Sequence, residues 1–389
     1  MLAIITSHPI QYQAPLWRAL ARDGRVPFEV WFLTPHAVLP AYDPEFGKSF
    51  AWDVDLLEGY PHRFLDVQPN WRLDSFGGIR MQRDWATELR VHGVTSIWLE
   101  GWRFSTLWKA AASAHHAGIQ VWLRGESHDL GPEAWSRRLW KRFALGWLFR
   151  RVDHFLSIGS ANHRFYLNHG VAESKLADAP YCVDNEHFAR IAADLRQRRE
   201  EFRHRWSIAD EAYCVLFCGK LISKKRPLDL LAAAQLSPEL AGRPVHLLFA
   251  GDGELARQVR EALIATPTLH GNVTGFLNQT EIPTVFAAAD CLVLPSDYGE
   301  TWGLVVNEAL ASGLPVIVSD RCGCATDLAA PLGKAHVFPC GDVRALADSL
   351  QRVAHHPPSP DVMRVLVEKY NPLRTVENVA ILWSHRPSS

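Results

Sequence analysis

The sequence predicts an α/β protein with two domains, each built on a parallel sheet covered by helices. Short apolar runs of strand length alternate with helical patterns along both halves of the chain, which is the rhythm of repeated βαβ units. One such unit occupies residues 291–318, where a strand, a glycine-bearing loop, a helix and a second strand follow one another. A chain of 389 residues is also long enough to fill two hydrophobic cores.

In the first half, the buried strands are expected to be short. A strand at 2–7 leads into a polar loop at 8–15 and then a helix from Leu16. The remaining elements expected in this half are strands at 30–33, 96–99, 119–123 and 155–158 and helices at 106–116, 133–152 and 161–169. Residues 36–85 show no clear periodicity, and a long irregular insert in a compact domain is often functional. This insert can line a site with Trp52, Trp71 and Arg72, although packing is the more common fate of a tryptophan.

The second half repeats the same rhythm. A charged helix over 190–211 is expected to link the two halves. The strands expected after it are 213–218, 245–250, 273–277, 291–294, 315–318 and 337–338.

Two carboxylates frame the helix of the 291–318 unit. Glu300 lies in the loop and Glu308 lies in the helix, and eight residues of helix span about 12 Å. This separation exceeds the roughly 5–9.5 Å of a hydrolytic carboxylate pair and suits two ends of one hydroxyl-rich ligand. The backbone N–H groups of Thr301, Trp302 and Gly303 open the helix between them, which favours an anion there. An anion between two polyols describes a nucleotide sugar; the alternative is two carboxylates that face water.

A cluster of cations follows the strand at 213–218. Gly219 ends that strand, and the next helix starts at Pro227. The cations between them are Lys220, Lys224, Lys225 and Arg226. Cations beside a helix N-terminus can hold phosphate, and a solvated basic loop is the alternative. Gly251 follows the strand at 245–250, where a glycine permits close approach of a ligand.

Polar side chains also follow two strands of the first half. In open α/β sheets, ligands bind beyond the carboxyl ends of strands. The candidates on this ground are His8, Gln11 and Gln13 after the first strand, and Arg124, Glu126, Ser127 and His128 after the strand at 119–123. The alternatives are loop packing for the first group and a buried ion pair between Arg124 and Glu126 for the second.

The net charge and the residue content of the chain limit the partners and the compartment that are expected. A net charge of −1 argues against a nucleic-acid partner held by a basic surface. Seven cysteines in mostly apolar contexts and no apolar run of membrane-spanning length favour a cytoplasmic protein. Cys322, Cys324, His336 and Cys340 match no zinc spacing, so neither a metal nor another cofactor is expected.

The helix expected at 133–152 is basic and amphipathic. It carries six Arg or Lys residues against one Glu, together with several tryptophans. Such a helix can make peripheral contact with an anionic membrane, which would place the protein at the inner face of that membrane. Packing of its apolar side into the core is the alternative.

Several motifs resemble one family. Glu300-x7-Glu308 followed by Ala-Leu-Ala-Ser-Gly-Leu-Pro-Val-Ile resembles the nucleotide-sugar site of retaining GT-B glycosyltransferases of family 4. Residues 219–226 are similar to the family's G-R-L-x-x-x-K-G stretch, with Lys220 in place of Arg and Lys225 at the Lys. Residues 8–15 resemble a bacterial subgroup of these enzymes, and residues 179–185 resemble the segment between its domains.

The resemblance implies the GT-B fold, with two Rossmann-like domains facing across a cleft. It places an acceptor domain at 1–190, a linker at 191–211, a donor domain at 212–370 and a helix at 371–389 that crosses back to the first domain. It implies retaining transfer of a hexose, without a divalent metal, from a nucleotide sugar to a saccharide or lipid-linked saccharide. The alternatives are an inactive nucleotide-sugar binder and a phosphorylase or epimerase of the same fold.

The resemblance also assigns roles to residues. Glu300 would hold sugar hydroxyls and Glu308 the ribose, while Lys220 and Lys225 would stabilise the leaving diphosphate. Phe276 and Leu277 would frame the base through their backbone. Many relatives carry a histidine at the end of the strand at 119–123; here Glu126 or Ser127 is closest, and His128 lies later.

Overall fold

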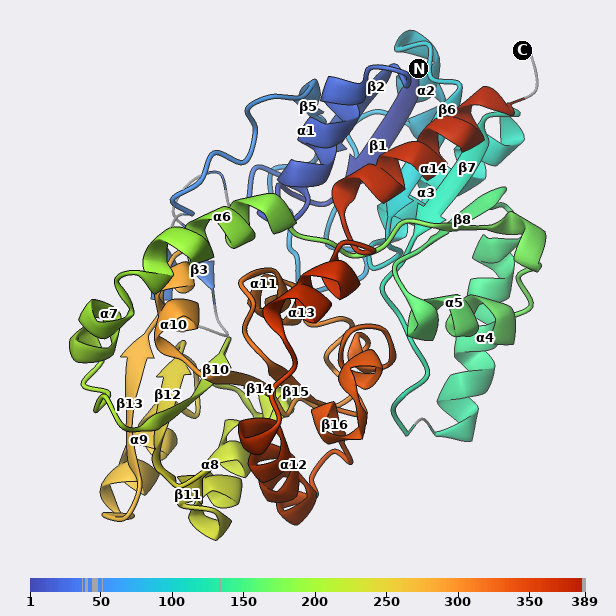
Figure 1. Ribbon diagram of the computed structural model, residues 1–389. Helices are drawn as coiled ribbons and strands as arrows, with labels where there is room; N and C mark the ends of the chain where they lie inside the picture. Colours follow the sequence, from blue (N-terminus) through green and yellow to red (C-terminus); the bar gives the residue numbers. More distant parts are fainter. Residues whose placement is uncertain (37, 39–40, 44–47, 51, 133, 387–389) are drawn as a thin grey trace. The chain divides into compact units, whose positions relative to one another are not determined.

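The computed structural model describes residues 1–36, 38, 41–43, 48–50, 52–132 and 134–386. The chain divides into two compact units, and Figure 1 labels their helices and strands. Unit 1 comprises Met1–Ala41, Asp55–Tyr181 and Pro372–Ser389, and unit 2 comprises Tyr42–Val54 and Cys182–Asn371. The longer segment of unit 2 begins at Cys182.

Unit 1 is built on a parallel sheet in the order β5-β2-β1-β6-β7-β8-β9. Its strands are β1 (Leu2–Thr6), β2 (Phe28–Phe32), β5 (His62–Phe64), β6 (Ser96–Glu100), β7 (Gln120–Arg124), β8 (His154–Ser157) and β9 (Leu176–Asp178). The chain runs from β1 toward β2 and then returns past β1 to β6. The sheet therefore changes direction between β1 and β6, which is the position where doubly wound sheets bind ligands.

Helices cover both faces of this sheet. They are α1 (Ala14–Asp23), α2 (Trp85–Val91), α3 (Ser105–His116), α4 (Trp135–Phe149), α5 (Ser160–Asn168) and α14 (Pro372–Ser384), with a 3₁₀ turn at Glu173–Lys175. Leu2 and Ile4 of β1 join one core with residues of α1 and α14. Ala3 and Ile5 join the other core, with residues of α2, α3, α4 and α5. The alternation along one strand is what a sheet buried on both faces requires.

Unit 2 contains a second sheet, in the order β11-β12-β10-β14-β15-β16, with β13 also paired to β12. Its strands are β10 (Tyr213–Cys218), β11 (Glu239–Leu240), β12 (Arg243–Ala250), β13 (His270–Gly275), β14 (Cys291–Leu294), β15 (Val316–Ser319) and β16 (Val337–Phe338). The pairing is parallel except between β11 and β12. The chain runs from β10 to β12 on one side and later continues from β14 on the other side, so the order of strands reverses beside β10. The short strands β3 (Ala41–Asp43) and β4 (Lys48–Phe50) pair separately.

The helices of unit 2 follow its strands. They are α6 (Asn185–Arg196), α7 (Arg199–Arg205), α8 (Pro227–Leu236), α9 (Ala256–Ile264), α10 (Ile282–Ala288), α11 (Leu304–Ala311), α12 (Val343–His355) and α13 (Pro360–Val367). Short helical turns lie at Ser223–Lys225, Ala325–Ala329, Ala330–Leu332 and Lys334–His336. The single helix expected at 190–211 is two helices, interrupted at Gln197 and Arg198, and both pack against α10. The expected start at residue 190 was also wrong. Helix α6 begins at Asn185, because Asp184 caps it by accepting a hydrogen bond from the His187 N–H.

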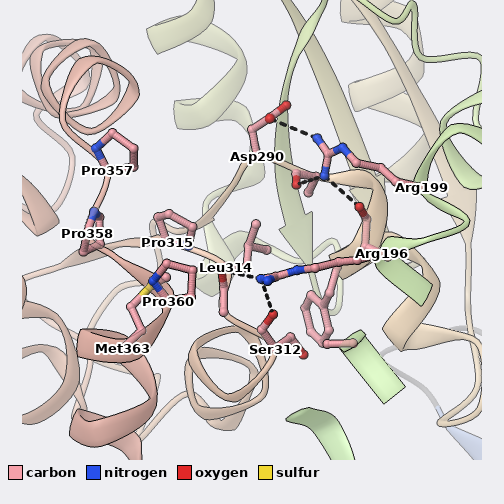
Figure 2. A pocket seen from close by; sticks show the side chains of 15 residues that line it. Arg196, Arg199, Asp290, Ser312, Leu314, Pro315, Pro357, Pro358, Pro360 and Met363 are labelled. Atoms are coloured by element: carbon pink, nitrogen blue, oxygen red, sulfur yellow. Dashed lines mark hydrogen bonds and ion pairs between the residues drawn. The ribbon is translucent and has the colours of Figure 1, made fainter. Parts of the chain in front are cut away.

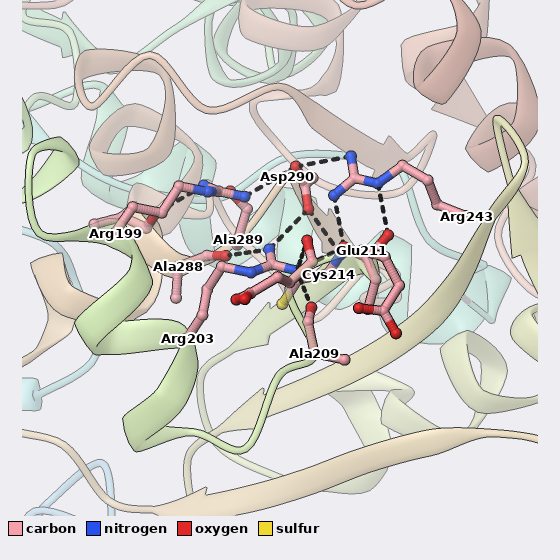
Figure 3. Close-up of polar contacts among 12 residues, drawn as sticks. Arg199, Arg203, Ala209, Glu211, Cys214, Arg243, Ala288, Ala289 and Asp290 are labelled. Atoms are coloured by element: carbon pink, nitrogen blue, oxygen red, sulfur yellow. Dashed lines mark hydrogen bonds and ion pairs between the residues drawn. The ribbon is translucent and has the colours of Figure 1, made fainter.

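An arginine cluster fastens α7 to the amino ends of the unit 2 strands. Figure 3 shows Asp290, which directly precedes β14, facing Arg199, Arg203 and Arg243. Asp290 Oδ2 also accepts a hydrogen bond of 2.8 Å from the backbone of Cys214 in β10. The guanidinium of Arg203 is buried and donates to the carbonyls of Ala209 and Ala212, each at 2.6 Å. One carboxylate thus ties together the starts of β10, β12 and β14.

Candidate active site

The sheet of unit 2 changes direction beside β10. The loops that follow β10 and β14 at this point carry the residues predicted to bind the donor. The loop after β10 holds Gly219 to Arg226, and the loop after β14 runs from Pro295 to Gly303. The backbone N–H of Asp297 donates to the carbonyl of Lys224 at 2.8 Å, so the two loops are joined directly. Both loops lie at carboxyl ends of adjacent parallel strands, as a ligand site of this sheet type requires.

Lys225 and Glu300 form an ion pair between these two loops. The Lys225 ammonium donates to Glu300 Oε2, and the hydroxyl of Ser296 donates to the same oxygen at 3.3 Å. Burial opposes the charge of Lys225, but the attraction and hydrogen bond from Glu300 raise its pKa above the ordinary value. The ion pair therefore joins the loop after β10 to the loop after β14.

The other predicted cations are arranged differently. Arg226 takes a left-handed backbone conformation (φ 50°), and its guanidinium turns to Asp229 at 2.6 Å. Lys220 is half-buried beside Gly219, and Lys224 is exposed. The expected clamp of four cations is therefore smaller, because Arg226 is committed to α8.

Two glycines let the backbone turns at this edge come close together. Gly251 has φ 151°, and a Cβ there would lie 1.9 Å from the carbonyl oxygen of Gly219. Gly303 has φ 104°, and its Cβ would lie 2.6 Å from a methyl group of Leu294. Since neither position tolerates a side chain, both loops keep a backbone surface at the carboxyl edge.

Helix α11 begins after Gly303 and carries Glu308. The first N–H groups of a helix have no partner within it and favour a negative charge nearby. The Trp302 indole is buried and donates to Asn307 Oδ1 at 2.8 Å, so its side chain is part of the core. Burial alone raises the pKa of the half-buried Glu308 to about 8.

The residues expected to frame the base follow β13. That strand ends at Gly275, so Phe276 and Leu277 lie beyond it, whereas a strand through 277 was expected. The ring of Phe276 lies 6.3 Å from that of Trp52. Trp52 belongs to unit 2, although the expected division placed it in the first domain.

Unit 1 carries its own polar cluster where its sheet changes direction. Glu100 ends β6, and its carboxylate accepts from Gln13 Nε2 at 3.3 Å and lies 3.6 Å from Arg124 Nη1. Its side chain is only 5% exposed. Burial raises the pKa of Glu100 to about 7; Arg124 opposes this shift and Glu126 adds to it.

Arg124 fits the buried ion-pair alternative rather than a ligand contact. Its guanidinium is buried and donates to the carbonyls of Ala179 and Pro180. Its acidic partner is Glu100, not the expected Glu126. Glu126 instead accepts a hydrogen bond from the hydroxyl of Tyr181.

The remaining predicted residues of unit 1 lie in the loops around this cluster. The Ser127 carbonyl accepts from Asn162 at 2.8 Å, and His128 Nδ1 accepts from the Leu130 N–H at 3.3 Å. His8 pairs with the Ser7 hydroxyl at 2.9 Å; its pKa is lowered to about 4 by burial, with smaller effects of His36 and Arg103. His8 is therefore neutral at physiological pH. Gln11 is half-buried in the same loop.

Four residues of these two clusters were not predicted. They are Tyr12, Glu100, Tyr181 and Ser296. The signal for two of them was present, because Glu100 ends one buried strand and Ser296 lies two residues beyond another. Tyr12 and Tyr181 pack ring edge against ring face at 5.7 Å, and this contact joins segments 169 positions apart.

A separate cavity lies at the opposite end of the unit 2 sheet. Its volume is about 480 Å³, and its walls include four prolines; Figure 2 shows Arg196 and Arg199 beside them. Asp290 and Pro315 in its wall directly precede β14 and β15, so it opens at the amino ends of these strands. Arg196 and Arg199 already donate to backbone carbonyls there. The cavity is thus distinct from the Lys225–Glu300 cluster.

Among the described residues, no helix combines the length and the apolar composition that a membrane span requires. Nor do those residues contain a group of three or more His, Cys, Asp or Glu side chains placed to hold a metal ion.

Comparison with known proteins agrees with this arrangement. Residues 198–367 match the family model described as glycosyl transferases group 1. The chain is 34% identical over 134 residues to an α-D-kanosaminyltransferase of Streptomyces kanamyceticus, a match that covers 34% of this chain and 33% of the relative. It is 33% identical over 240 residues to a GDP-mannose-dependent α-mannosyltransferase of Mycobacterium tuberculosis, covering 61% of this chain and 57% of the relative. The chain therefore spans less than two thirds of the length of these relatives.

The likeness to solved structures extends over the whole chain. The Anabaena protein HepE, crystallised with UDP-glucose, superposes with a TM-score of 0.68 at 16% identity and covers 99% of both chains. At this identity the likeness concerns the fold. Residues 198–367 are therefore similar to glycosyltransferase group 1, and the chain as a whole has the two-domain fold of the GT-B glycosyltransferases.

Proposed function

We propose that the chain is a glycosyltransferase that moves a hexose from a nucleoside diphosphate sugar to a saccharide or lipid-linked saccharide, with retention of configuration. The observation that carries this proposal is the Lys225–Glu300 ion pair, placed between the loops after β10 and β14. A cation and a carboxylate at one point suit a ligand that joins a phosphate to a polyol. The matched relative is named for GDP-mannose, and the solved structure holds UDP-glucose.

The residues of unit 2 divide the donor between them. The diphosphate lies by the start of α11, with Lys225 and Lys220 beside it, where positive charge stabilises the leaving group. Glu300 accepts hydrogen bonds from hydroxyls of the sugar. Glu308, further along α11, accepts from the ribose.

In the transfer step, the bond between the anomeric carbon and the diphosphate oxygen breaks, and its electron pair stays on the diphosphate. The acceptor oxygen forms a new bond to the anomeric carbon on the same face of the ring, and its proton passes to the departing phosphate. Charge therefore grows on the phosphate as the reaction proceeds, which is where preorganised cations contribute most. Retention itself is carried over from the resemblance of the motifs.

The test is Glu300→Gln, which keeps the shape of the side chain but removes its charge. We expect transfer to fall by at least about a hundredfold, within the range seen when one preorganised polar group is removed. The control is Glu261→Gln, since Glu261 lies exposed on α9 and pairs only with Arg257 across one helical turn. Product formation is measured with the donor that stabilises the protein most in a thermal-shift screen. Full turnover by a folded Glu300→Gln protein would refute the role.

A second candidate is a nucleotide-sugar binder without transferase activity. It is favoured by the loop after β7, which carries Glu126 and Ser127 where many relatives carry a histidine. Hydrolysis of the donor in the absence of acceptor distinguishes the two. An enzyme releases free sugar slowly and loses this activity with Glu300→Gln, whereas a binder shows saturable binding and no release.

A further inference from the structure

Helix α4 presents an apolar surface that the fold of unit 1 does not cover. Trp135 is 80% exposed, Trp140 is 78% exposed and Phe143 is 70% exposed. Leu139 and Trp147 are also exposed. Large apolar side chains gathered on one surface of a soluble domain usually mark an interaction site.

These five side chains occupy one side of the helix. At 100° per residue, Trp135, Leu139, Phe143, Trp147 and Trp140 fall within an arc of about 140°. We call this set the α4 aromatic face. Arg138, Lys141 and Arg142 lie outside the arc, so the helix has an apolar side and a basic side, and neither side is buried over this stretch.

The helix is anchored at one end only. Its buried residues Leu145, Leu148 and Phe149 all fall in the last five positions and join the core of unit 1. Phe149 packs against Phe155 at 4.9 Å, and Trp147 stacks on Trp108 at 5.8 Å. From Trp135 to Ala144 no residue with a described side chain is buried, and Figure 1 shows α4 continuing beyond its packed end beside α5.

The charge on this segment has one sign. Between Trp135 and Val152 the sequence contains six cations and no Asp or Glu: Arg137, Arg138, Lys141, Arg142, Arg150 and Arg151. The Arg151 guanidinium lies 3.7 Å from the ring centre of Trp147, so a cation and an aromatic ring share the C-terminal end of the face. Tryptophan and basic side chains together are typical of helices that lie in the headgroup region of an anionic bilayer.

Other occupants fit less well. A helix of 15 residues spans about 22 Å, short of the roughly 30 Å hydrocarbon layer, so it can lie on a membrane but not cross it. A second copy of the segment 135–152 would bring six more cations near these six, and like charges oppose such a contact.

We propose that α4 docks the protein on an anionic phospholipid surface, with the α4 aromatic face in the headgroup region and the cations beside lipid phosphates. Docking does not depend on the proposed function. If that function also holds, docking selects the lipid-linked acceptor over the free saccharide, because an acceptor held in the bilayer would then be presented to an enzyme already on its surface.

Co-sedimentation of the full chain with phospholipid vesicles tests the proposal. One set of vesicles is phosphatidylcholine alone, and the other contains about 30 mol% phosphatidylglycerol. We expect binding to the anionic vesicles to exceed binding to the neutral ones by about tenfold at about 0.1 M salt, and to weaken at about 0.5 M salt.

The decisive variant is Trp135→Ser, Trp140→Ser and Phe143→Ser combined, which should reduce vesicle binding by about tenfold or more. These side chains are exposed, so the fold should survive, and donor hydrolysis in solution should be unchanged. The matched control combines Leu236→Ser, Ile264→Ser and Leu373→Ser, three exposed apolar residues on other helices. It should bind vesicles like the unaltered chain.

Three results would overturn the proposal. The first is no binding of the unaltered chain to anionic vesicles at low salt, and the second is equal binding by the α4 variant. The third is a dimer in solution, seen by light scattering and abolished by the α4 variant, which would assign the face to a second copy. If the unaltered chain binds vesicles but hydrolyses no donor, the result would instead count against the proposed function alone.

Discussion

At the scale of single residues, the candidate site pairs charged groups with nearby groups whose charge depends on pH. Lys225 forms an ion pair with Glu300, and this contact raises the pKa of Lys225 above its ordinary value. Glu308 lies in the next helix, and burial alone raises its pKa to about 8. Glu100 in unit 1 is likewise shifted to about 7. These two shifts give each unit a measurable signature that an ordinary surface carboxylate lacks.

Nucleotide binding should grow stronger as pH rises through the pKa of Glu308. Ribose hydroxyls donate to a carboxylate, so binding favours the deprotonated form and must release the proton held below about pH 8. Between about pH 6.5 and about pH 8.5 we expect affinity for a nucleoside diphosphate to rise roughly tenfold or more. Calorimetry in two buffers of different ionisation enthalpy measures both the affinity and the number of protons released on binding. Glu308→Gln should remove the pH slope, and an unchanged slope in that variant would exclude Glu308 as its source.

Stability should fall with pH because of Glu100. Its pKa is raised from an ordinary 4.5 to about 7, so its contribution to folding is complete below about 4.5 and is lost as pH rises through 7. The loss is on the order of 3 kcal/mol. Urea unfolding of the native chain and of Glu100→Gln at several pH values gives the difference in free energy. That difference should change between pH values of about 4.5 and 7, and a constant difference would contradict the assignment.

At the scale of elements, long-range polar contacts decide how the loops and helices are held. The carboxylate of Asp290 fixes α7 to three strands. The hydrogen bond between Asp297 and Lys224 joins the two loops that carry Glu300 and Lys225. These contacts act at opposite ends of one sheet: Asp290 lies at the amino ends and Glu300 lies beyond the carboxyl ends. Stability and binding in unit 2 can therefore be altered separately.

Asp290→Ala should destabilise the protein by about 3–5 kcal/mol, because it leaves the buried Arg203 without its carboxylate. The free energy of unfolding in urea measures this loss. Glu281→Ala, which removes the exposed partner of Arg205, is the control and should cost about 0–1 kcal/mol. Similar values for the two variants would mean that the Asp290 cluster contributes no more than a surface pair.

At the scale of the whole molecule, the sequence predicted what periodicity and local motifs encode. The strands Tyr213–Cys218 and Cys291–Leu294 were predicted residue for residue, because continuous apolar runs specify buried parallel strands. The edge strand His62–Phe64 was missed, since three residues with two polar side chains give no such run. The break between α6 and α7 was also missed, because charged residues on both sides continue a helical pattern.

Within unit 2, the sequence placed Lys225 and Glu300 in loops that follow two strands. The ion pair between them was not predicted. The partner of Arg124 proved to be Glu100, because neighbours across a parallel sheet are not neighbours in sequence. A single sequence does not show which residues will be neighbours on adjacent strands.

The central claim is that Lys225 holds the diphosphate of the donor. Isothermal titration of the unaltered chain and of Lys225→Ala with a nucleoside diphosphate and the matching monophosphate tests it most directly. The unaltered chain should prefer the diphosphate by about tenfold or more, and Lys225→Ala should lose most of that preference while still binding the monophosphate. An undiminished preference in a folded Lys225→Ala protein would contradict the account.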